Sequence, residues 1–453
     1  MKRKISVALQ LFVLMSFLNL NAQWVRIYSG DQQEQMLSAA LTNDGGCIAV
    51  GWTNSFGVAG EDMWVLKVNS FGDIEWQRSY GGNDWDEGLD IQKTDDGGYI
   101  AVGQTRSFGS GNHDFWILKL NSSGQIEWQH TYGGPEWDTA RSVHQTNDNG
   151  YIVAGNTRSF GSGLDDLWIL KLDSTGQVEW QRTHGGVMSE NMACIRQTQD
   201  GGFIFAASSY SYGPGPLGIW IQKLSPSGQI EWQFSYGGID SDSVRAIQQT
   251  TDGGYIVLCR SYSFGIGLSD YLVLKLDQSG NIEWQRTLGG PLWDTPQSVH
   301  QTGDGGYILA GDTYSFGAGE ADCYILKLDS MGNLEWEHVY GGPGYDSAQF
   351  IQQTEDEGYL IAGTSTSFGS GDSSFMMFKI SPEGEIDQSC GSTGFIIGNS
   401  NSTQSTPASI HCPVQTLPVG TNVVYYTTNI SPADTSSQSQ LLCAKKKKGG
   451  NIR

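Results

Sequence analysis

The stretch that decides the fold is residues 151–186, which read YIVAGNTRSFGSGLDDLWILKLDSTGQVEWQRTHGG. With its neighbours it recurs seven times at a spacing of 52 residues, without insertions. The aromatic residue of its Ser-Phe-Gly segment returns at Phe56, Phe108, Phe160, Tyr212, Phe264, Phe316 and Phe368. A period of about 40–50 residues with four short strand signals per unit is typical of a β-propeller. The repeat therefore predicts an all-β, seven-bladed β-propeller of four-stranded blades.

Each unit contains two predicted hairpins. Residues 142–146 and 151–157 flank a turn that reads Asp-Gly-Gly in most copies, and glycine supplies the positive φ that tight turns need. Residues 167–172 and 177–182 flank a second turn, predicted as a three-residue loop with Gly176 left-handed. That loop pairs Leu172 with Val178, Lys171 with Glu179 and Leu170 with Trp180. The register places apolar side chains opposite one another and Lys opposite Glu.

The N-terminal segment matches the end of a unit rather than its beginning. Trp24 is in phase with Trp76, Trp128, Trp180, Trp232, Trp284 and Trp336, whereas the next position in the series holds Gln388. We therefore expect the N-terminal strand to complete the seventh blade and close the ring, which leaves fewer exposed strand edges. The predicted blades are 37–80, 89–132, 141–184, 193–236, 245–288, 297–340, and 349–380 completed by 24–28.

Two further series predict the core. The inner-strand core face is expected at Ala39, Ile91, Val143, Ile195, Ile247, Val299 and Ile351. Packing between blades is expected from the tryptophan series above and from Trp64, Trp116, Trp168 and Trp220. Most of the 15 tryptophans thus have a structural interpretation before any ligand is considered.

The two ends of the chain differ from the repeats. Residues 1–22 place Lys2, Arg3 and Lys4 before an apolar run and end near the small residue Ala22, as secretory signal peptides do. We expect cleavage there, no membrane span in the mature chain, and a secreted, periplasmic or cell-surface location. The propeller is predicted over 23–387. Residues 388–453 form a Ser/Thr-rich tail with a basic run at 445–448, and a small β appendage, a stalk or a sorting tail would each fit it.

Charge and cysteine usage restrict the partners. Residues 23–387 hold 18 Lys and Arg against 47 Asp and Glu, a net charge of −29. Such a surface repels phosphate backbones and anionic lipid, so nucleic acid is not an expected partner; solubility explains the acidity equally well.

Cys47, Cys194, Cys259 and Cys323 occupy different repeat positions and are expected to be buried thiols. Cys390, Cys412 and Cys443 cluster in the tail, where an exported protein can form one disulfide, and the odd count leaves at least one thiol unpaired.

A family resemblance attaches to the segment WILKLDSTGQVEWQRTHGG. It resembles the tryptophan-docking repeat of quinoprotein-like bacterial propellers, in which an Asp, a Gly and then a Trp four residues on lock adjacent blades. Here Asp173 lies three residues before Gly176 rather than four, so the match is partial. The whole unit is similar to secreted bacterial repeat propellers that are sometimes labelled endoglucanase-like. The resemblance covers about 23–387 and implies the fold; it transfers no quinone-site residue and no cofactor.

An aromatic–carboxylate pair marks the candidate site. It recurs in the loops that join one blade to the next, at Trp85-Asp86, Trp137-Asp138, Trp293-Asp294 and Tyr345-Asp346, while Glu190 and Asp242 keep the acid behind Ser189 and Ser241. A flat ring beside a carboxylate suits a sugar, whose CH face stacks while its hydroxyls donate hydrogen bonds. The alternative is structural: the acid accepts backbone N–H bonds of the turn and the ring covers a blade edge.

Three other series have structural interpretations. Asp62, Asp114, Asp166, Asp270 and Asp322 are expected to cap the Ser-Phe-Gly loop. Asp44, Asp96, Asp148, Asp200, Asp252, Asp304 and Asp356 are expected to form turns. Lys67, Lys119, Lys171, Lys223, Lys275, Lys327 and Lys379 are expected to form cross-strand ion pairs. The calcium-loop spacing is absent, and we predict no metal site.

Nucleophile-elbow, zinc-protease and phosphate-loop motifs are absent from the sequence. The sequence therefore predicts an exported, monomeric, non-catalytic binding propeller that needs no cofactor and whose partner is a carbohydrate or a protein surface. The alternative is a glycoside hydrolase or lyase that uses carboxylates of the same loops.

Overall fold

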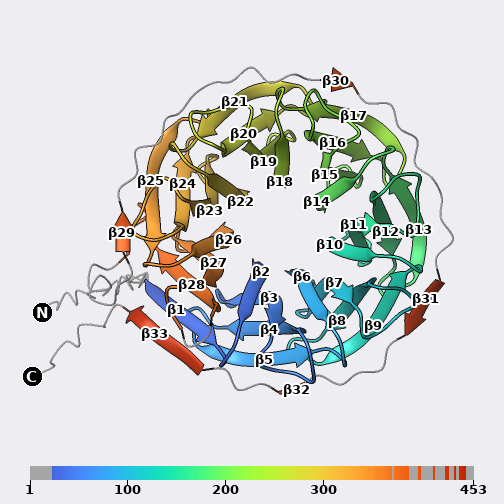
Figure 1. Ribbon diagram of the computed structural model, residues 1–453, viewed down its shortest axis with the longest axis horizontal. Helices are drawn as coiled ribbons and strands as arrows, with labels where there is room; N and C mark the ends of the chain where they lie inside the picture. Colours follow the sequence, from blue (N-terminus) through green and yellow to red (C-terminus); the bar gives the residue numbers. More distant parts are fainter. Residues whose placement is uncertain are drawn as a thin grey trace, which may run out of the picture.

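Seven antiparallel sheets, each built from four strands of the repeats, stand around a central axis in the computed structural model (Figure 1). The structure describes residues 23–369 and 372–386, together with the backbone of five short strands beyond residue 387. Within these residues no apolar helix of membrane-spanning length occurs. The predicted all-β, seven-bladed propeller is confirmed. The predicted signal peptide, 1–22, lies outside the described residues.

The strands follow the repeat blade by blade. Blades one to three comprise β2 (Glu34–Leu41), β3 (Cys47–Thr53), β4 (Asp62–Val68), β5 (Ile74–Tyr80); β6 (Asp86–Lys93), β7 (Tyr99–Thr105), β8 (Asp114–Leu120), β9 (Ile126–Gly133); and β10 (Asp138–Gln145), β11 (Tyr151–Thr157), β12 (Asp166–Leu172), β13 (Val178–His184). Blades four and five comprise β14 (Glu190–Gln197), β15 (Phe203–Ser209), β16 (Gly218–Leu224), β17 (Ile230–Tyr236); and β18 (Asp242–Gln249), β19 (Tyr255–Ser261), β20 (Asp270–Leu276), β21 (Ile282–Leu288). Blades six and seven comprise β22 (Asp294–Gln301), β23 (Tyr307–Thr313), β24 (Asp322–Leu328), β25 (Leu334–Gly341); and β26 (Asp346–Gln353), β27 (Tyr359–Ser365), β28 (Ser374–Ile380), β1 (Trp24–Ser29).

Every blade begins three residues earlier than its predicted bounds because its first strand is longer than expected. In blade one, β2 starts at Glu34, which pairs with Thr53, and the ladder shifts register between Met36 and Ser38. A β-bulge adds an unpaired residue to one strand and interrupts its inside–outside alternation. The period-2 pattern therefore reveals the strand after the bulge and misses the three residues before it.

The N-terminal strand closes the ring, as predicted. β1 pairs with β28 in an antiparallel register that sets Trp24 against Lys379 and Tyr28 against Phe375. Trp24 is buried, and its indole N–H donates to the Ser70 carbonyl of blade one at 3.1 Å. β1 lies beside β28 and completes the seventh blade (Figure 1).

The predicted register of the outer hairpin needs a correction. The turn is as expected, with Gly176 at φ +84° and a bond from the Asp173 N–H to the Gln177 carbonyl at 2.9 Å. Leu172 pairs with Val178, but Lys171 lies opposite Trp180 and Leu170 opposite Gln181. The predicted Lys171–Glu179 and Leu170–Trp180 backbone pairs are wrong because a bulge inserts one residue at this point.

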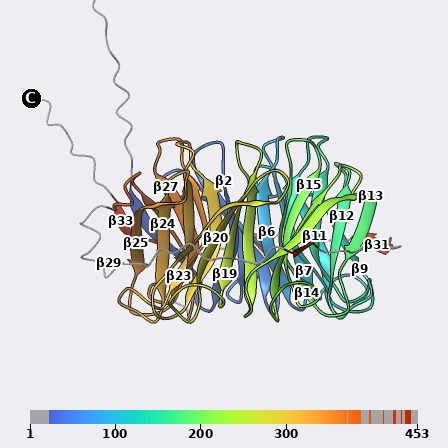
Figure 2. The same cartoon turned by 90° about the horizontal axis from the view of Figure 1, so that it is seen from above.

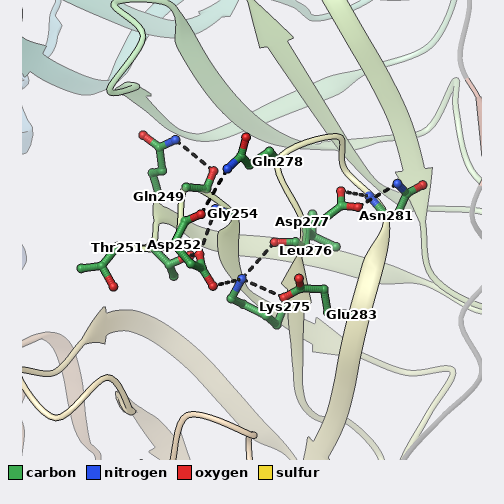
Figure 3. A network of polar contacts seen from close by, with 12 residues as sticks. Gln249, Thr251, Asp252, Gly254, Lys275, Leu276, Asp277, Gln278, Asn281 and Glu283 are labelled. Carbon is green, nitrogen blue, oxygen red and sulfur yellow. Dashed lines mark hydrogen bonds and ion pairs between the residues drawn. The ribbon is translucent and has the colours of Figure 1, made fainter.

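The lysine series nevertheless forms its ion pairs, as blade five illustrates (Figure 3). The Lys275 ammonium lies 2.9 Å from Asp252 Oδ2 and 3.0 Å from Glu283 Oε2, and it also donates to the Leu276 carbonyl. Burial opposes the charge of Asp252, but hydrogen bonds from Thr250 and Lys275 outweigh it and lower the pKa of Asp252 to about 2. The turn acid thus both forms its turn and neutralises a buried lysine.

Tryptophan docking joins the blades. The Trp76 indole donates to the Ser122 carbonyl at 3.0 Å, and the Tyr80 hydroxyl donates to the Gly124 carbonyl at 2.5 Å. A Cβ on Gly124 would lie 2.7 Å from the Trp76 ring, so only glycine fits beneath the indole. The same approach recurs at Trp24–Gly72, Trp128–Gly176, Trp180–Gly228, Trp232–Gly280, Trp284–Gly332 and Trp336–Gly384. The predicted inter-blade packing is confirmed.

Both predicted core series are also buried. The seven inner-strand positions are at most 6% exposed, and Trp64, Trp116, Trp168 and Trp220 are fully buried. Cys47, Cys194, Cys259 and Cys323 are buried free thiols, as predicted. The cysteines of the tail lie outside the residues whose side chains the structure describes.

Strands from the tail add to the outer edges of five blades. They are β29 (Ile396–Gly398) on β25, β30 (Cys412–Pro413) on β17, β31 (Val424–Thr427) on β9, β32 (Ala433–Asp434) on β5, and β33 (Gln438–Ala444) on β1. β1 therefore lies between β28 and β33, so strands from both ends of the chain share one sheet.

Candidate functional site

One flat face of the ring carries two sets of loops, those from the second to the third strand and those from one blade to the next. We call this side the loop face. The tight hairpins form the opposite side, which we call the hairpin face. Loops project from both flat sides of the ring (Figure 2). Sixteen large hydrophobic side chains are exposed in the described residues, and all except Phe71 and Met331 lie in loops of the loop face. The loop face is therefore the candidate interaction surface.

The candidate aromatic rings lie on this face and contact solvent. Trp85, Trp137 and Trp293 are 48%, 46% and 43% exposed, and Tyr345 is half-buried. Arg106 lies 5.5 Å from the Trp85 ring centroid and Arg158 lies 5.7 Å from that of Trp137, in cation–π geometry. Each guanidinium packs against its indole, and part of each ring remains exposed to solvent.

The candidate acids, unlike the rings, are buried inside the protein. Asp86, Asp138, Glu190, Asp242, Asp294 and Asp346 are all fully buried. In blade three, Asp138 Oδ2 accepts the Gly134 N–H at 2.8 Å and the Ser159 hydroxyl at 2.7 Å. Burial raises the pKa of Asp138, and these hydrogen bonds oppose that rise. The structure therefore does not bring ring and carboxylate together on the surface: the ring faces solvent and the acid holds the inter-blade turn.

The rings are not needed to build the turn. The Trp137 carbonyl accepts the Arg158 N–H at 2.8 Å, and in the next two blades the Ser189 and Ser241 carbonyls accept the N–H of Tyr210 and Tyr262 at 3.0 and 3.1 Å. The structural contact at this position is thus made by the main chain, which serine provides equally well. The aromatic side chain is not required for this contact; the Trp137 ring packs against His113, with ring centroids 4.2 Å apart, and leaves part of its surface exposed.

Tyr210 and Tyr262 are site residues that the sequence reasoning missed. They are 47% and 45% exposed, and they lie beside the two serines that replace the aromatic residue. Six inter-blade positions therefore keep a ring on the loop face: Trp85, Trp137, Tyr210, Tyr262, Trp293 and Tyr345. The seventh holds Gln33 beside Asn54. The sequence signal was available, because both tyrosines replace an arginine at the position before Ser-Phe-Gly or Ser-Tyr-Gly, but only the bond between the two loops shows that their side chains are neighbours.

The second acid series caps its loop, as predicted. Asp114 Oδ2 accepts the Ser110 and Gly111 N–H groups at 2.8 and 3.2 Å. Its Oδ1 points at the first glycine of the Tyr-Gly-Gly segment, where a Cβ on Gly133 would lie 1.7 Å away. Burial raises the pKa of Asp114 to about 6 and those of Asp62 and Asp270 to about 7, against an ordinary value of 3.8.

These raised pKa values predict that mild acid stabilises the propeller. A carboxyl whose folded pKa is raised contributes its stability fully below the unfolded pKa and loses it as pH rises through the folded pKa. The turn acids, such as Asp252 with a pKa of about 2, lose their contribution only as pH falls below about 4. As the pH is lowered, we expect the melting temperature to rise from about pH 8 to about pH 5 and then to fall towards about pH 3. Calorimetry across this pH range tests the prediction, and a lower melting temperature at pH 5 than at pH 8 would contradict it. The Asp270→Asn variant should show a smaller change of melting temperature between pH 5 and pH 8 than the parent.

Comparisons with known proteins place the chain by fold alone. No protein-family model and no curated protein matches the sequence. A solved structure of a puromycin hydrolase variant in complex aligns with a TM-score of 0.50 at 12% identity, over 82% of this chain and 55% of that one. A Bacteroides caccae protein of unknown function aligns with a TM-score of 0.38 at 12% identity, over 70% of this chain and 93% of that one. Chaetomium thermophilum Sqt1, bound to the N-terminus of a ribosomal protein, aligns with a TM-score of 0.45 at 12% identity, over 78% of this chain and 98% of that one. At 12% identity the puromycin hydrolase alignment bears on the fold alone and transfers no activity or partner to this chain.

Proposed function

We propose that the protein is an exported, non-catalytic binding module whose loop face binds carbohydrate. The observation that carries this proposal is that six of the seven inter-blade positions keep an aromatic ring in contact with solvent. Five of these rings are exposed and Tyr345 is half-buried, and in two blades the ring comes from the neighbouring loop. A flat, half-exposed indole or phenol stacks on the CH face of a sugar. The six rings come from six repeats, which suits a repeated ligand such as a polysaccharide.

A protein surface is the second candidate partner. It is favoured by the aliphatic side chains on the same loops, of which Val187 and Ile239 are 79% and 76% exposed. Sugars make little use of such groups, whereas protein interfaces bury them. A glycan array and a pull-down with the mature chain distinguish the two partners.

The hydrolase or lyase alternative relies on carboxylates of the loop face. The six inter-blade acids are fully buried beneath the turns, so they do not offer the solvent-facing pair that glycoside hydrolysis requires. Incubation with a polysaccharide panel tests the alternative directly. New reducing ends would support an enzyme, and retention without cleavage would support a binding module.

Replacing Trp137 with alanine tests the role of the rings. We expect Trp137→Ala to weaken a bound glycan by about 1–2 kcal/mol, the scale of one aromatic contact, with little change in melting temperature. Trp168→Ala is the matched control: this indole is fully buried, so its loss should cost about 3–5 kcal/mol of folding free energy. If Trp137→Ala melts as far below the parent as Trp168→Ala does, the rings stabilise the fold rather than bind a ligand.

A further inference from the structure

The central channel contains a cavity whose charge differs from that of the protein around it. The cavity measures about 1050 Å³ and extends between the first strands of the blades toward the turns of the hairpin face. Four cationic side chains line it, Lys93, Arg141, Arg196 and Arg245, against two carboxylates, Asp90 and Asp95. Residues 23–387 as a whole carry a net charge of −29. The channel is therefore a local cationic site in an acidic molecule.

Two of these arginines have no hydrogen-bond or ion-pair partner among the described residues. Residues 23–387 hold 18 Lys and Arg, and 16 of them form a hydrogen bond or ion pair with described residues. The two that form neither with the described part of the chain are Arg141 of β10 and Arg245 of β18, and both line the channel. An arrangement in which the only unpartnered cations of this set share one cavity indicates a ligand rather than general surface charge.

Three acids near the channel accept hydrogen bonds from other groups. Asp90 Oδ2 accepts the Val143 N–H at 2.9 Å, and its Oδ1 accepts the Ser38 hydroxyl at 2.7 Å and the Ile91 N–H at 3.0 Å. Asp312 accepts a bond from Ser347, and Glu87 accepts one from the Gln104 amide. The charges of Glu87 and Asp312 reach Arg141 and Arg245, but neither forms an ion pair with them. The described carboxylates thus leave both guanidinium groups open.

The arginines also repel one another. Burial between the channel walls, together with the charges of Arg260 and Arg141, lowers the pKa of Arg245, which remains protonated. Arg141 and Arg245 are nevertheless both exposed to solvent. Arg196 donates to the Ser142 hydroxyl at 2.9 Å and to the Ile195 carbonyl at 2.8 Å, and it pairs with no carboxylate of the described residues. His144 and His300 of the wall have pKa values lowered to about 4 by burial and by Arg196, so they are neutral near pH 7.

We propose that this cavity binds a ligand with at least two oxyanion groups, held by Arg141 and Arg245. Guanidinium groups bind carboxylate, sulfate or phosphate oxygens in pairs and with charge assistance, which is the chemistry left unused here. The ligand is either a free small polyanion or the charged groups of an acidic oligosaccharide. None of the six rings of the loop face lines the cavity, although Tyr262 lies near enough to influence the charge of Arg245. The proposal does not rest on the function of those rings.

Calorimetric titration of the mature protein tests the proposal with citrate, inorganic sulfate and an oligogalacturonate as probes. Ionic strength is held constant with chloride, so that screening alone does not mimic binding. The test variant is Arg141→Gln/Arg245→Gln. The matched control is Arg182→Gln/Arg286→Gln, which removes the same charge from the outer strands β13 and β21. We expect at least one probe to bind, about tenfold or more weakly to the test variant and unchanged to the control.

The outcomes separate the sources of the anion. Binding of citrate or sulfate that depends on Arg141 and Arg245 indicates a free small anion, and dependence seen only with the oligogalacturonate indicates an acidic glycan. Without a ligand the test variant should melt at the same temperature as the parent or higher, because it removes like-charge repulsion. No binding by any probe, equal binding by both double variants, or equal stabilisation by chloride would overturn the proposal. A failure of neutral glycans to bind would overturn the function proposed for the loop face and leave this site unaffected.

Discussion

Deletion of residues 24–28 will open the ring at the seventh blade. It removes most of β1, in which every residue except Arg26 is buried, and leaves β28 without its outer partner. The loss of the Trp24 indole alone should cost about 3–5 kcal/mol. We expect the melting temperature to fall by at least about 10 °C and the protein to aggregate through the newly exposed strand edge.

Two comparisons make this prediction specific. Trp24→Ala keeps the backbone of β1 and should show only the side-chain part of the effect. A synthetic peptide of residues 23–30, added to the deleted protein, should restore solubility by pairing with β28 as an added strand. An unchanged melting temperature after the deletion would disprove closure by the N-terminal strand.

Gly133→Ala will have the second large effect. A methyl group at this position would lie 1.7 Å from Asp114 Oδ1, a carboxylate that is held by two backbone N–H groups and cannot easily withdraw. Overpacking of this kind costs about 1–3 kcal/mol, and we expect the upper end because the neighbouring group is buried and charged. Thermal or denaturant unfolding measures the loss.

Blade seven supplies the control for this substitution. There Ser374 occupies the position of Asp114, and Ser29 occupies that of Gly133. The shorter serine leaves room for a Cβ on its neighbour. We therefore expect Asp114→Ser/Gly133→Ala to be more stable than the sum of the two single changes by at least about 1 kcal/mol. Additive effects would show that the carboxylate does not dictate the glycine.

The repeat made most of the fold predictable. A 52-residue period without insertions gives the blade count directly, and the phase of Trp24 against Gln388 gives the closing strand. Burial could be inferred for the core series and the tryptophans because each apolar position is repeated seven times in one context. Strand starts and the outer register were predicted wrongly because a β-bulge adds a residue that a period-2 pattern does not reveal.

The candidate site depended more on tertiary structure. The sequence placed Trp85 and Asp86 side by side, and adjacent residues of an extended chain point to opposite sides, so the ring reaches solvent while the acid is buried. Tyr210 becomes the neighbour of Ser189 only through a bond between two loops.

The channel shows the same division. Arg141 and Arg245 are 104 positions apart, which is two repeat lengths, so the repeat places them at the same position of blades three and five but does not show that they lack partners. Composition fixed the number of cations and acids in residues 23–387, and the repeat fixed the scaffold. Only the closed ring decided which charges found partners, because hydrogen bonds and ion pairs depend on distances of a few ångströms between residues that the sequence does not bring together.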